Sequence, residues 1–288
     1  MYHKLLLADA GGTSTDWAFV DGPRYEVFKS EGLNPLTMQT DELDRRMQSA
    51  VGLMREKGVS GPLRLRYYGA GCRGIGRDTM LGLLQRHLAW LDIDEWVVDS
   101  DMVGAAQATC GKTDGIVCIL GTGSNSCLWQ GGQIVRQVAA GGFILGDEAS
   151  GATLGRQLVS DYIKGLLPDD VAHKFAIDYP DLSYETIIEN VYRSRTPQRY
   201  LASFAYFLIE NRQLAGVRQM MDKEFERFFE RVVRQYGDSA QTVSFVGGLA
   251  AAFEAELRDK AKEKGFSVGK VLKNPIEGLV AQATQQAL

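Results

Sequence analysis

Several patterns that identify common protein classes are missing from this chain of 288 residues. It contains no run of about 20 apolar residues, so we expect no membrane-spanning helix. The apolar stretch near the N-terminus ends at Asp9 and is too short for a signal-peptide core. A formal net charge of −4 supplies no basic surface for nucleic acid or an anionic membrane. The composition therefore predicts a cytoplasmic protein that binds neither nucleic acid nor membrane.

Cysteine and histidine are also scarce, with four cysteines and three histidines in the whole chain. No two cysteines form a C-x-x-C pair, and the histidines are scattered. Zinc sites and simple iron–sulfur sites need closely spaced ligands of these types, so the sequence predicts neither. We expect free, partly buried thiols at the four cysteines, which are Cys72, Cys110, Cys118 and Cys127.

What the chain does contain is a pair of similar glycine-rich turns about 110 residues apart. The first lies within Leu5–Trp17 and the second within Ile116–Trp129. Each consists of an apolar strand-like run, a tight turn of Gly, Ser and Thr, and a second strand-like run. Such a turn presents backbone N–H groups and hydroxyls to an anion. The pair predicts a nucleotide held by two similar domains.

The pattern around these turns predicts an α/β protein with two domains. Strand-like and helical segments alternate over residues 1–113, which is typical of helices packed on a sheet. We predict a second domain over 114–274 that carries a helical insertion, and a closing helix over 275–288 that completes the first domain. The helical segments expected in the second domain are Gly151–Leu166, Ser183–Val191, Gln198–Arg212 and Gly216–Tyr236.

The two turns carry the residue types that phosphate binding needs. Asp9 ends an apolar strand and can hold Mg²⁺ or its waters, since Mg²⁺ prefers oxygen ligands. Gly11 and Gly12 allow close approach to a phosphate, and Thr13 can donate a hydrogen bond to it. The second turn, Gly121-Thr122-Gly123-Ser124-Asn125, can hold the β- and γ-phosphates. The alternative for each turn is a plain β-hairpin. Neither matches a P-loop or a Rossmann fingerprint.

Two further strand ends are candidates for the same site. Gly247 and Gly248 separate a strand from a helix, an arrangement that suits an adenosine face or an α-phosphate. It is equally typical of close strand–helix packing. Asp101 follows a strand and begins a helix, where it could act as a general base toward a hydroxyl. The alternative is a helix N-cap at Ser100 or Asp101.

A third group of residues could contact a hydroxylated substrate. Asp147 and Glu148 follow a glycine-rich segment and could bind neighbouring sugar hydroxyls or support a metal. They could instead cap the next helix and occupy its first turn. Asn34 precedes a proline and offers an amide in a rigid turn, although Asn-Pro also begins ordinary turns. Gly71 lies in another glycine-rich strand end that we expect to line the same cleft.

The order of these motifs resembles the superfamily of acetate and sugar kinases, heat-shock chaperones and actin. Within it, the chain is most similar to the BadF/BadG/BcrA/BcrD ATPase group, which includes the N-acetylglucosamine kinases. The resemblance rests on Asp9–Thr13, Gly121–Asn125, Phe245–Gly248, Ser100–Ala105 and Gly146–Ser150. It implies two actin-like (ribonuclease H-like) α/β domains with a nucleotide cleft between them.

The resemblance also implies an ATP-dependent kinase that phosphorylates an amino sugar, N-acetylglucosamine at its 6-hydroxyl, with Mg²⁺. Asp101 is then the catalytic residue and Asp9 the Mg²⁺ residue, acting through water. The implied ATP contacts are Gly11, Gly12, Thr13, Gly121, Thr122, Gly123, Ser124, Gly247 and Gly248. The implied sugar contacts are Asn34, Gly71, Asn125, Gly142, Phe143, Asp147 and Glu148. Homodimers are common among such relatives, so a homodimer is consistent with the resemblance.

The sequence departs from the N-acetylglucosamine kinases in two ways and leaves two alternative functions open. The sugar loop reads Phe143-Ile144-Leu145 where vertebrate-type N-acetylglucosamine kinases carry a tryptophan, and the chain is shorter than the animal enzyme. The acceptor could therefore be glucosamine or N-acetylmuramic acid. The other alternative is an ATPase activator of a 2-hydroxyacyl-CoA dehydratase or benzoyl-CoA reductase system, which would hold a [4Fe–4S] cluster through cysteines.

Overall fold

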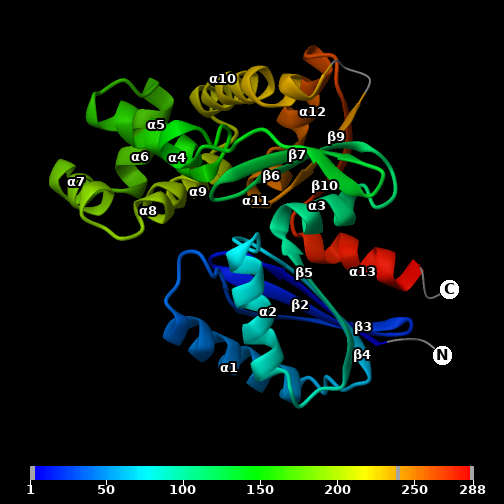
Figure 1. Cartoon of the computed structure of the whole chain (residues 1–288). Helices are drawn as coiled ribbons and strands as arrows, with labels where there is room; N and C mark the ends of the chain where they lie inside the picture. Colours follow the sequence, from blue (N-terminus) through cyan, green and yellow to red (C-terminus); the bar gives the residue numbers. More distant parts are fainter. Residues whose placement is uncertain (1–3, 238–240, 286–288) are drawn as a thin grey trace. The chain divides into compact units, whose positions relative to one another are not determined.

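The computed structural model describes residues 4–237 and 241–285 of the chain. The described chain divides into two compact units. Unit 1 contains the residues up to Lys112 together with those from Asn274 onward, and unit 2 is Thr113–Lys273. Each unit is built on one five-stranded mixed sheet with helices on it (Figure 1). No helix among the described residues is long and apolar enough to cross a membrane.

Unit 1 has the strand order β3-β2-β1-β4-β5. Strands β1, β2 and β3 are antiparallel neighbours, whereas β4 runs parallel to both β1 and β5. The strands are β1 (Lys4–Ala10), β2 (Ser14–Asp21), β3 (Arg24–Glu31), β4 (Leu63–Gly69) and β5 (Ile93–Ser100). The helices are α1 (Thr40–Glu56), α2 (Ile75–His87), α3 (Asp101–Thr109) and α13 (Pro275–Gln285).

The helices of unit 1 cover the two faces of its sheet. Leu6 and Ala8 of β1 lie in one apolar core with buried residues of α1 and α2. The closing helix α13 packs against α3, β1 and β2, and its Gln282 side chain donates to the carbonyl oxygen of Gln107 on α3. Figure 1 shows α13, in red, beside α3. The last helix of the chain therefore belongs to the same unit as the first strand.

Unit 2 repeats this strand order as β8-β7-β6-β9-β10. Again the first three strands in sequence are antiparallel neighbours, and the last two run parallel to the first. The strands are β6 (Gly115–Leu120), β7 (Ser124–Gln130), β8 (Gln133–Arg136), β9 (Thr242–Val246) and β10 (Ser267–Leu272). The repeat is the physical basis of the similarity between the two turns, because β1–β2 and β6–β7 occupy equivalent places in their sheets.

Most of the helices of unit 2 lie between β8 and β9 in sequence. They are α4 (Gly142–Leu145), α5 (Gly151–Ile163), α6 (Asp169–Asp178), α7 (Tyr184–Tyr192), α8 (Pro197–Ser203), α9 (Ala205–Glu210) and α10 (Ala215–Arg231), followed after β9 by α11 (Gly248–Ala252) and α12 (Glu254–Glu263). The long helix α10 carries an apolar stripe, since its Met221, Phe225, Phe228 and Phe229 are buried in the core.

Three local expectations differ from the structure. The helix expected over Gly216–Tyr236 ends at Arg231 and is followed by a 3₁₀ turn, Val233–Tyr236. The helix expected over Gln198–Arg212 is divided at Phe204 into α8 and α9. The segment between Gly141 and Gly151 contains a single helical turn, α4, rather than only loop. Apolar periodicity continues through the first two of these breaks, because the side chains on both sides pack into one core.

Candidate active site

A row of charged side chains crosses the sheet of unit 1 near the end of β1. Strand register places Lys29, Asp16, Asp9, Tyr68 and Asp99 side by side on β3, β2, β1, β4 and β5. Because alternate residues of a strand point to opposite faces, these paired positions share one face. The Lys29 ammonium lies 3.3 Å from the Asp16 carboxylate. Three carboxylates and one ammonium therefore meet on a single face of the sheet.

Asp101 lies at the same edge, one residue beyond the end of β5. Ser100 is the N-cap of α3 and accepts a hydrogen bond from the N–H of Val103, which leaves Asp101 as the first residue of the helix. The cap expected at this position is thus confirmed for Ser100. Burial raises the pKa of Asp101, while hydrogen bonding to the Met102 N–H and the charge of Arg73 act in the opposite direction.

Asp9 has the most perturbed carboxyl group of this cluster. Burial, followed by the charges of Asp101 and Asp16, raises its pKa from 3.8 to about 7, and the charge of Lys29 offsets part of this shift. A cation placed among these oxygens would favour the ionised carboxylates. No group of three His, Cys, Asp or Glu side chains among the described residues is arranged to hold a metal ion. Asp9 therefore fits an ion that takes most of its ligands from water and phosphate, as Mg²⁺ commonly does.

The first glycine-rich turn is held at both of its ends. The N–H of Gly11 donates to the carbonyl oxygen of Ser14, and the N–H of Gly32 donates to that of Thr13. A Cβ on Gly32 would lie 2.5 Å from the carbonyl oxygen of Gly11, so the chain after β3 packs directly on the turn. The Thr13 side chain is exposed at its tip. The backbone of the turn is therefore held by hydrogen bonds and by close packing, while Thr13 is exposed, as in a turn that binds an anion.

Asn34 and Gly71 lie in contact in unit 1. A Cβ on Gly71 would lie 2.5 Å from the Asn34 side-chain oxygen, and Gly71 has a φ of +80°, so glycine is needed there on both counts. The Asn34 side-chain oxygen accepts the N–H of Leu36, which fixes the turn before α1. Ala70, next to Gly71, donates its N–H to the carbonyl oxygen of Ala10 at the end of β1. The expected substrate residues of unit 1 thus lie beside its carboxylate row.

The second glycine-rich turn is supported by the start of α5. The N–H of Gly121 donates to the carbonyl oxygen of Gly123 within the turn. The N–H groups of Gly151 and Ala152 donate to the carbonyl oxygens of Gly121 and Thr122. These bonds satisfy two of the N–H groups that a helix leaves unpaired at its beginning. Thr122 is exposed at the tip of the turn, as Thr13 is in unit 1.

Gly247 packs against the strand that leads into this second turn. It has a φ of +124°, and a Cβ there would lie only 2.2 Å from the carbonyl oxygen of Leu120. Its N–H donates to the carbonyl oxygen of Leu272, which joins the ends of β9 and β10. Gly248 begins α11, and a Cβ on it would have no neighbour within 4 Å. Gly247 is thus a packing glycine, whereas Gly248 leaves open surface next to the turn.

Asp147 joins the second turn to the segment that contains α4. Its carboxylate accepts the backbone N–H groups of Ser124 and Gly142. Burial raises the pKa of Asp147 to about 6, with these hydrogen bonds lowering it and the nearby Glu148 raising it. A Cβ on Gly123 would lie 3.0 Å from an Asp147 carboxylate oxygen. Asp147 and Gly142, two of the residues expected to contact the sugar, are therefore brought together beside Ser124, the turn residue that precedes Asn125.

Phe143 is half-buried on α4, and the two residues after it, Ile144 and Leu145, are exposed. The side-chain oxygen of Asn125 accepts the N–H of Ser126 and the side-chain amide of Gln137. These hydrogen bonds fix the Asn125 side chain, and they leave Ile144 and Leu145 of α4 exposed. The segment from Gly141 to Ser150, which we call the sugar loop, thus presents an apolar surface beside a buried carboxylate.

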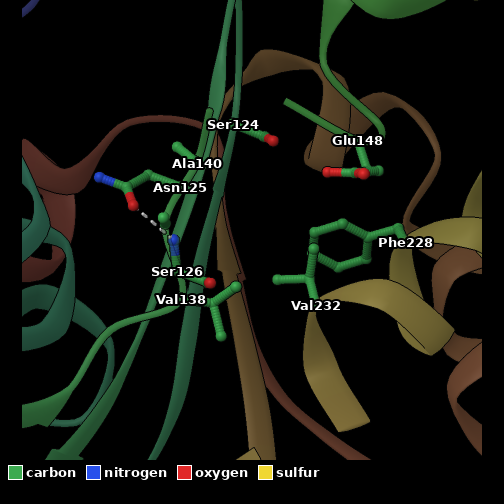
Figure 2. Close-up of a pocket in the computed structure, with 9 residues that line it drawn as sticks. Ser124, Asn125, Ser126, Val138, Ala140, Glu148, Phe228 and Val232 are labelled. Carbon is green, nitrogen blue, oxygen red and sulfur yellow. Dashed lines mark hydrogen bonds between the residues drawn. The ribbon is translucent and has the colours of Figure 1, made fainter. Parts of the chain in front are cut away.

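A small pocket lies on the other side of β7, between that strand and α10 (Figure 2). Its empty volume, open solvent at its mouth included, is only about 210 Å³, and it is lined by Ser124, Asn125, Ser126, Val138, Ala139, Ala140, Glu148, Phe228 and Val232. This volume lies below the range of about 300–1,000 Å³ typical of small-molecule sites. Figure 2 shows Glu148 on the same side of the pocket as Phe228 and Val232, across from Ser126 and Val138. The pocket is therefore the inner side of the sugar loop rather than a sugar-sized cavity.

Three side chains near the site were not expected from the sequence. The Gln198 amide of α8 approaches Gly123 and would lie 3.3 Å from a Cβ there. Glu224 and Arg231 of α10 contact Ala149 and Glu148 of the sugar loop. Each of these three residues lies about 50 residues or more along the chain from the residue that it contacts. Each belongs to a helix whose sequence pattern is explained by its buried apolar residues. No local sequence signal distinguishes these residues from the other polar residues of their helices.

Comparisons with solved structures give three informative matches. A protein of Porphyromonas gingivalis, provisionally named an N-acetylglucosamine kinase, is 34% identical over 99% of this chain and 100% of its own, with a TM-score of 0.88. One from Chromobacterium violaceum with the same provisional name is 17% identical over 99% of both chains, with a TM-score of 0.72. A ROK family glucokinase of Streptomyces griseus, solved with glucose and AMPPNP, is 16% identical over 98% of both chains, with a TM-score of 0.57.

These matches confirm the predicted fold class, an α/β protein of the actin-like two-domain type. At 17% and 16% identity, the second and third matches bear on the fold alone. No protein-family model matches the chain, and no curated protein matches its sequence.

Proposed function

The chain belongs to the sugar kinases of the actin-like ATPase superfamily, and from this membership we propose that it phosphorylates an amino sugar with ATP. The finer proposal is N-acetylglucosamine as the acceptor, with its 6-hydroxyl as the attacking group. The motif order further supports a place in the BadF/BadG/BcrA/BcrD group. The observation that carries the proposal is the placement of Asp101 beside the carboxylate row, at the sheet edge that also holds Asn34 and Gly71.

In this proposal Asp101 is the general base. As the sugar hydroxyl oxygen attacks the γ-phosphorus, its proton passes to the Asp101 carboxylate, and the bond from phosphorus to the bridging oxygen of ADP breaks. Asp101 is suited to this role because burial raises its pKa and so strengthens the carboxylate as a base, while Arg73 limits the shift. The N-cap at Ser100 fixes the first turn of α3 and hence the Asp101 backbone.

The nucleotide contacts are assigned to both glycine-rich turns. Gly11, Gly12 and Thr13 would hold the γ-phosphate, and Gly121–Ser124 would hold the β- and γ-phosphates through N–H groups and hydroxyls. Gly247 and Gly248 would lie beside the adenosine or the α-phosphate. Mg²⁺, when bound, neutralises charge on the phosphates. Asp9 would hold its waters, which agrees with a carboxylate surrounded by Asp16 and Asp101.

The acceptor is assigned to Asn34 and Gly71 in unit 1 and to Asn125, Gly142, Phe143 and Asp147 in unit 2. Asp147 is the strongest of these assignments, because its carboxylate already joins the second turn to the sugar loop. We propose that the two units are the two domains of the kinase, with the boundaries described above. The roles assigned to nucleotide and sugar fall on residues of both units.

The activator alternative needs cysteine thiolates that can reach an iron–sulfur cluster shared between subunits. Cys72, Cys118 and Cys127 are each 1% exposed or less. Burial, then the charges of Asp101 and Asp99, raises the pKa of Cys72 to about 12. These three thiols are poor cluster ligands, and only the fourth cysteine, Cys110, is partly exposed, which supports the kinase over the activator. An iron determination on protein purified without oxygen provides the direct check.

The decisive experiment is an ADP-release assay with MgATP and a panel of sugars. The panel should include N-acetylglucosamine, glucosamine, N-acetylmuramic acid, N-acetylmannosamine and glucose. We expect sugar-dependent ADP release with highest kcat/KM for N-acetylglucosamine, and the product should carry phosphate on its 6-oxygen by NMR. Asp101→Asn protein is the control for contaminating kinases. ADP release that no sugar stimulates would contradict the proposal, and a preference for another sugar would correct its finer part.

A further inference from the structure

The turn at the end of the sugar loop has an unfavourable backbone. Asp147 has a φ of +51° and Ala149 a φ of +57°, and these are the only non-glycine residues with positive φ among those that the structure describes. Side chains other than glycine rarely adopt this conformation, and it persists only where the surroundings enforce it. Glu148 lies between the two. Something must hold this turn in place, and the structure shows what does.

Two carboxylates connect the turn to α10. The Glu224 carboxylate accepts the N–H of Ala149 at 2.8 Å. The Glu148 carboxylate, only 5% exposed, lies 2.5 Å from Nε of Arg231 and 3.8 Å from an Nη of Arg227. Arg227 also lies 3.9 Å from Glu224. The sugar loop and α10 are therefore joined by the hydrogen bond from the Ala149 backbone to Glu224 and by the ion pairs of Glu148 with Arg227 and Arg231.

Successive side chains of the turn point to different partners. The Asp147 carboxylate accepts N–H groups of the second glycine-rich turn and of the sugar loop. Glu148 instead lines the pocket against α10, as Figure 2 shows. One of its carboxylate oxygens, Oε1, is thus paired with Arg231 and Arg227 of α10. The direction of Glu148 separates it from Asp147, although the two are neighbours in a motif that suggests a shared role.

We propose that Glu148 and Glu224 are positioning residues, which hold the turn around Asp147 against α10 so that Asp147 meets the acceptor. The inference rests on the proposed function, because it takes Asp147 to be an acceptor-binding residue. Glu224 acts by accepting the Ala149 N–H and Glu148 by pairing with Arg231, and neither contacts the sugar. This changes the role that the sequence motif implies for Glu148 and adds Glu224 and Arg231, which no motif marks.

The first test compares Glu224→Ala with Glu224→Gln. The glutamine keeps a side-chain oxygen that can accept the Ala149 N–H, whereas alanine removes it. We expect Glu224→Ala to raise the KM for the sugar about tenfold, the size expected for losing a hydrogen bond to a charged group. The KM for ATP should change less than about twofold, and Glu224→Gln should restore most of the sugar KM. The matched control is Glu230→Ala, which removes an exposed acid of α10 that pairs with Arg234 and Lys264.

Hydrogen exchange provides a readout that does not depend on catalysis. We expect backbone amides over residues 146–152 to exchange faster in Glu224→Ala than in the wild type, and to be protected in Glu224→Gln and Glu230→Ala. If the wild-type protein phosphorylates no sugar, the proposed function fails, and the exchange result still decides whether α10 holds the turn. Equal exchange in all four proteins would overturn the inference.

A second pair of variants distinguishes positioning by Glu148 from direct contact with the sugar. If Glu148 acts through Arg231, then Glu148→Gln, Arg231→Gln and the double variant should raise the sugar KM to a similar extent, since the changes remove one interaction. If Glu148 contacts the sugar, Glu148→Gln should raise the sugar KM while Arg231→Gln and Glu224→Ala leave it unchanged. That second pattern would overturn the proposal.

Discussion

The β1–β2 turn of unit 1 and the β6–β7 turn of unit 2 occupy equivalent places in sheets of the same strand order. Each joins the central strand to its antiparallel neighbour and exposes a threonine at its tip, Thr13 in one and Thr122 in the other. Each has a glycine packed closely against it, Gly32 or Gly247. Up to this point the two turns are copies of one anion-binding device.

Their surroundings differ in charge. The turn of unit 1 lies beside Asp9, Asp16 and Asp101, and burial, followed by the charges of Asp101 and Asp16, raises the pKa of Asp9 to about 7. The turn of unit 2 has helix α5 behind it and is contacted by Asp147, whose carboxylate accepts backbone N–H groups. A repeated topology therefore supplies two similar turns, both of which we propose to bind phosphate. The residues added after each strand end make one suited to a cation and a base, and the other suited to holding the acceptor.

The proposed difference between the two turns depends most on Asp101, which we propose as the general base among the acids of unit 1. We predict that Asp101→Asn lowers kcat on the order of 10³-fold, within the range of about 10²–10⁴ typical of losing a general base. ATP affinity, measured by calorimetry, should stay within a few-fold of the wild type. The matched control is Asp99→Asn, since Asp99 lies in the same row and its side-chain oxygen accepts the Ser100 N–H. Similar losses in both variants would show that the charge of the row matters, and not a base at Asp101.

The role of Gly247 in the second turn can be tested through stability. Gly247→Ala places a Cβ against the carbonyl oxygen of Leu120 at a φ of +124°, so the backbone must shift. We predict a loss of about 2–4 kcal/mol in the free energy of unfolding, from overpacking and backbone strain together. Gly248→Ala is the control, because a Cβ there has no neighbour within 4 Å. Chemical denaturation of both variants gives the comparison, and equal midpoints would show that the packing at Leu120 can relax.

The sequence predicted the strands around both turns because short apolar runs bounded by glycine and polar residues have few other structures available. Leu63–Gly69 is a strand-like run in the sequence and forms β4, and the run Glu95–Asp99 lies within β5. The closing helix was expected over 275–288 and is α13 over Pro275–Gln285, with 286–288 outside the described residues. Local signals were sufficient for these elements because the apolar pattern that predicts each one lies within a short segment of the chain.

The contacts that hold the sugar loop could not be predicted in the same way. Glu224 meets Ala149, and Arg231 meets Glu148, across more than 70 residues of sequence. On a helix with a buried apolar stripe, these two residues look like part of the solvated face. The positive φ of Asp147 and Ala149 has no sequence signal either, since neither is glycine. What decides these features is tertiary packing, which a single sequence does not reveal.

A smaller effect is expected at the cation side of the comparison. Asp9→Asn removes the charge that would hold the waters of Mg²⁺. We predict that the Mg²⁺ concentration giving half-maximal activity rises about 10–100-fold, as is usual for an outer ligand, while the sugar KM changes little. The control is Asp21→Asn, an exposed acid at the end of β2 that lies 3.6 Å from Lys4. A Mg²⁺ dependence that does not change in Asp9→Asn would place the cation elsewhere.

The smallest predicted effect concerns Asp147, the acid that distinguishes the second turn. Burial raises its pKa to about 6, so the carboxyl group is ionised above that pH and protonated below it. Only in the ionised form do both carboxylate oxygens of Asp147 act purely as acceptors. They can then accept hydrogen bonds from the Ser124 and Gly142 N–H groups and from a sugar hydroxyl. We predict that Asp147→Asn binds the sugar about tenfold more weakly than the wild type near pH 8, in line with one charge-assisted hydrogen bond.

The sign follows from the titration. As the pH falls through about 6, the wild-type carboxyl group takes up a proton and comes to resemble the neutral amide of the variant. The ratio of the two sugar affinities, measured by calorimetry, should therefore shrink toward one below about pH 5, because other ionising groups affect both proteins alike. A ratio that stays constant between pH 8 and 5 would mean that the charge of Asp147 does not contribute to acceptor binding. The two turns would then differ only in the acids of unit 1.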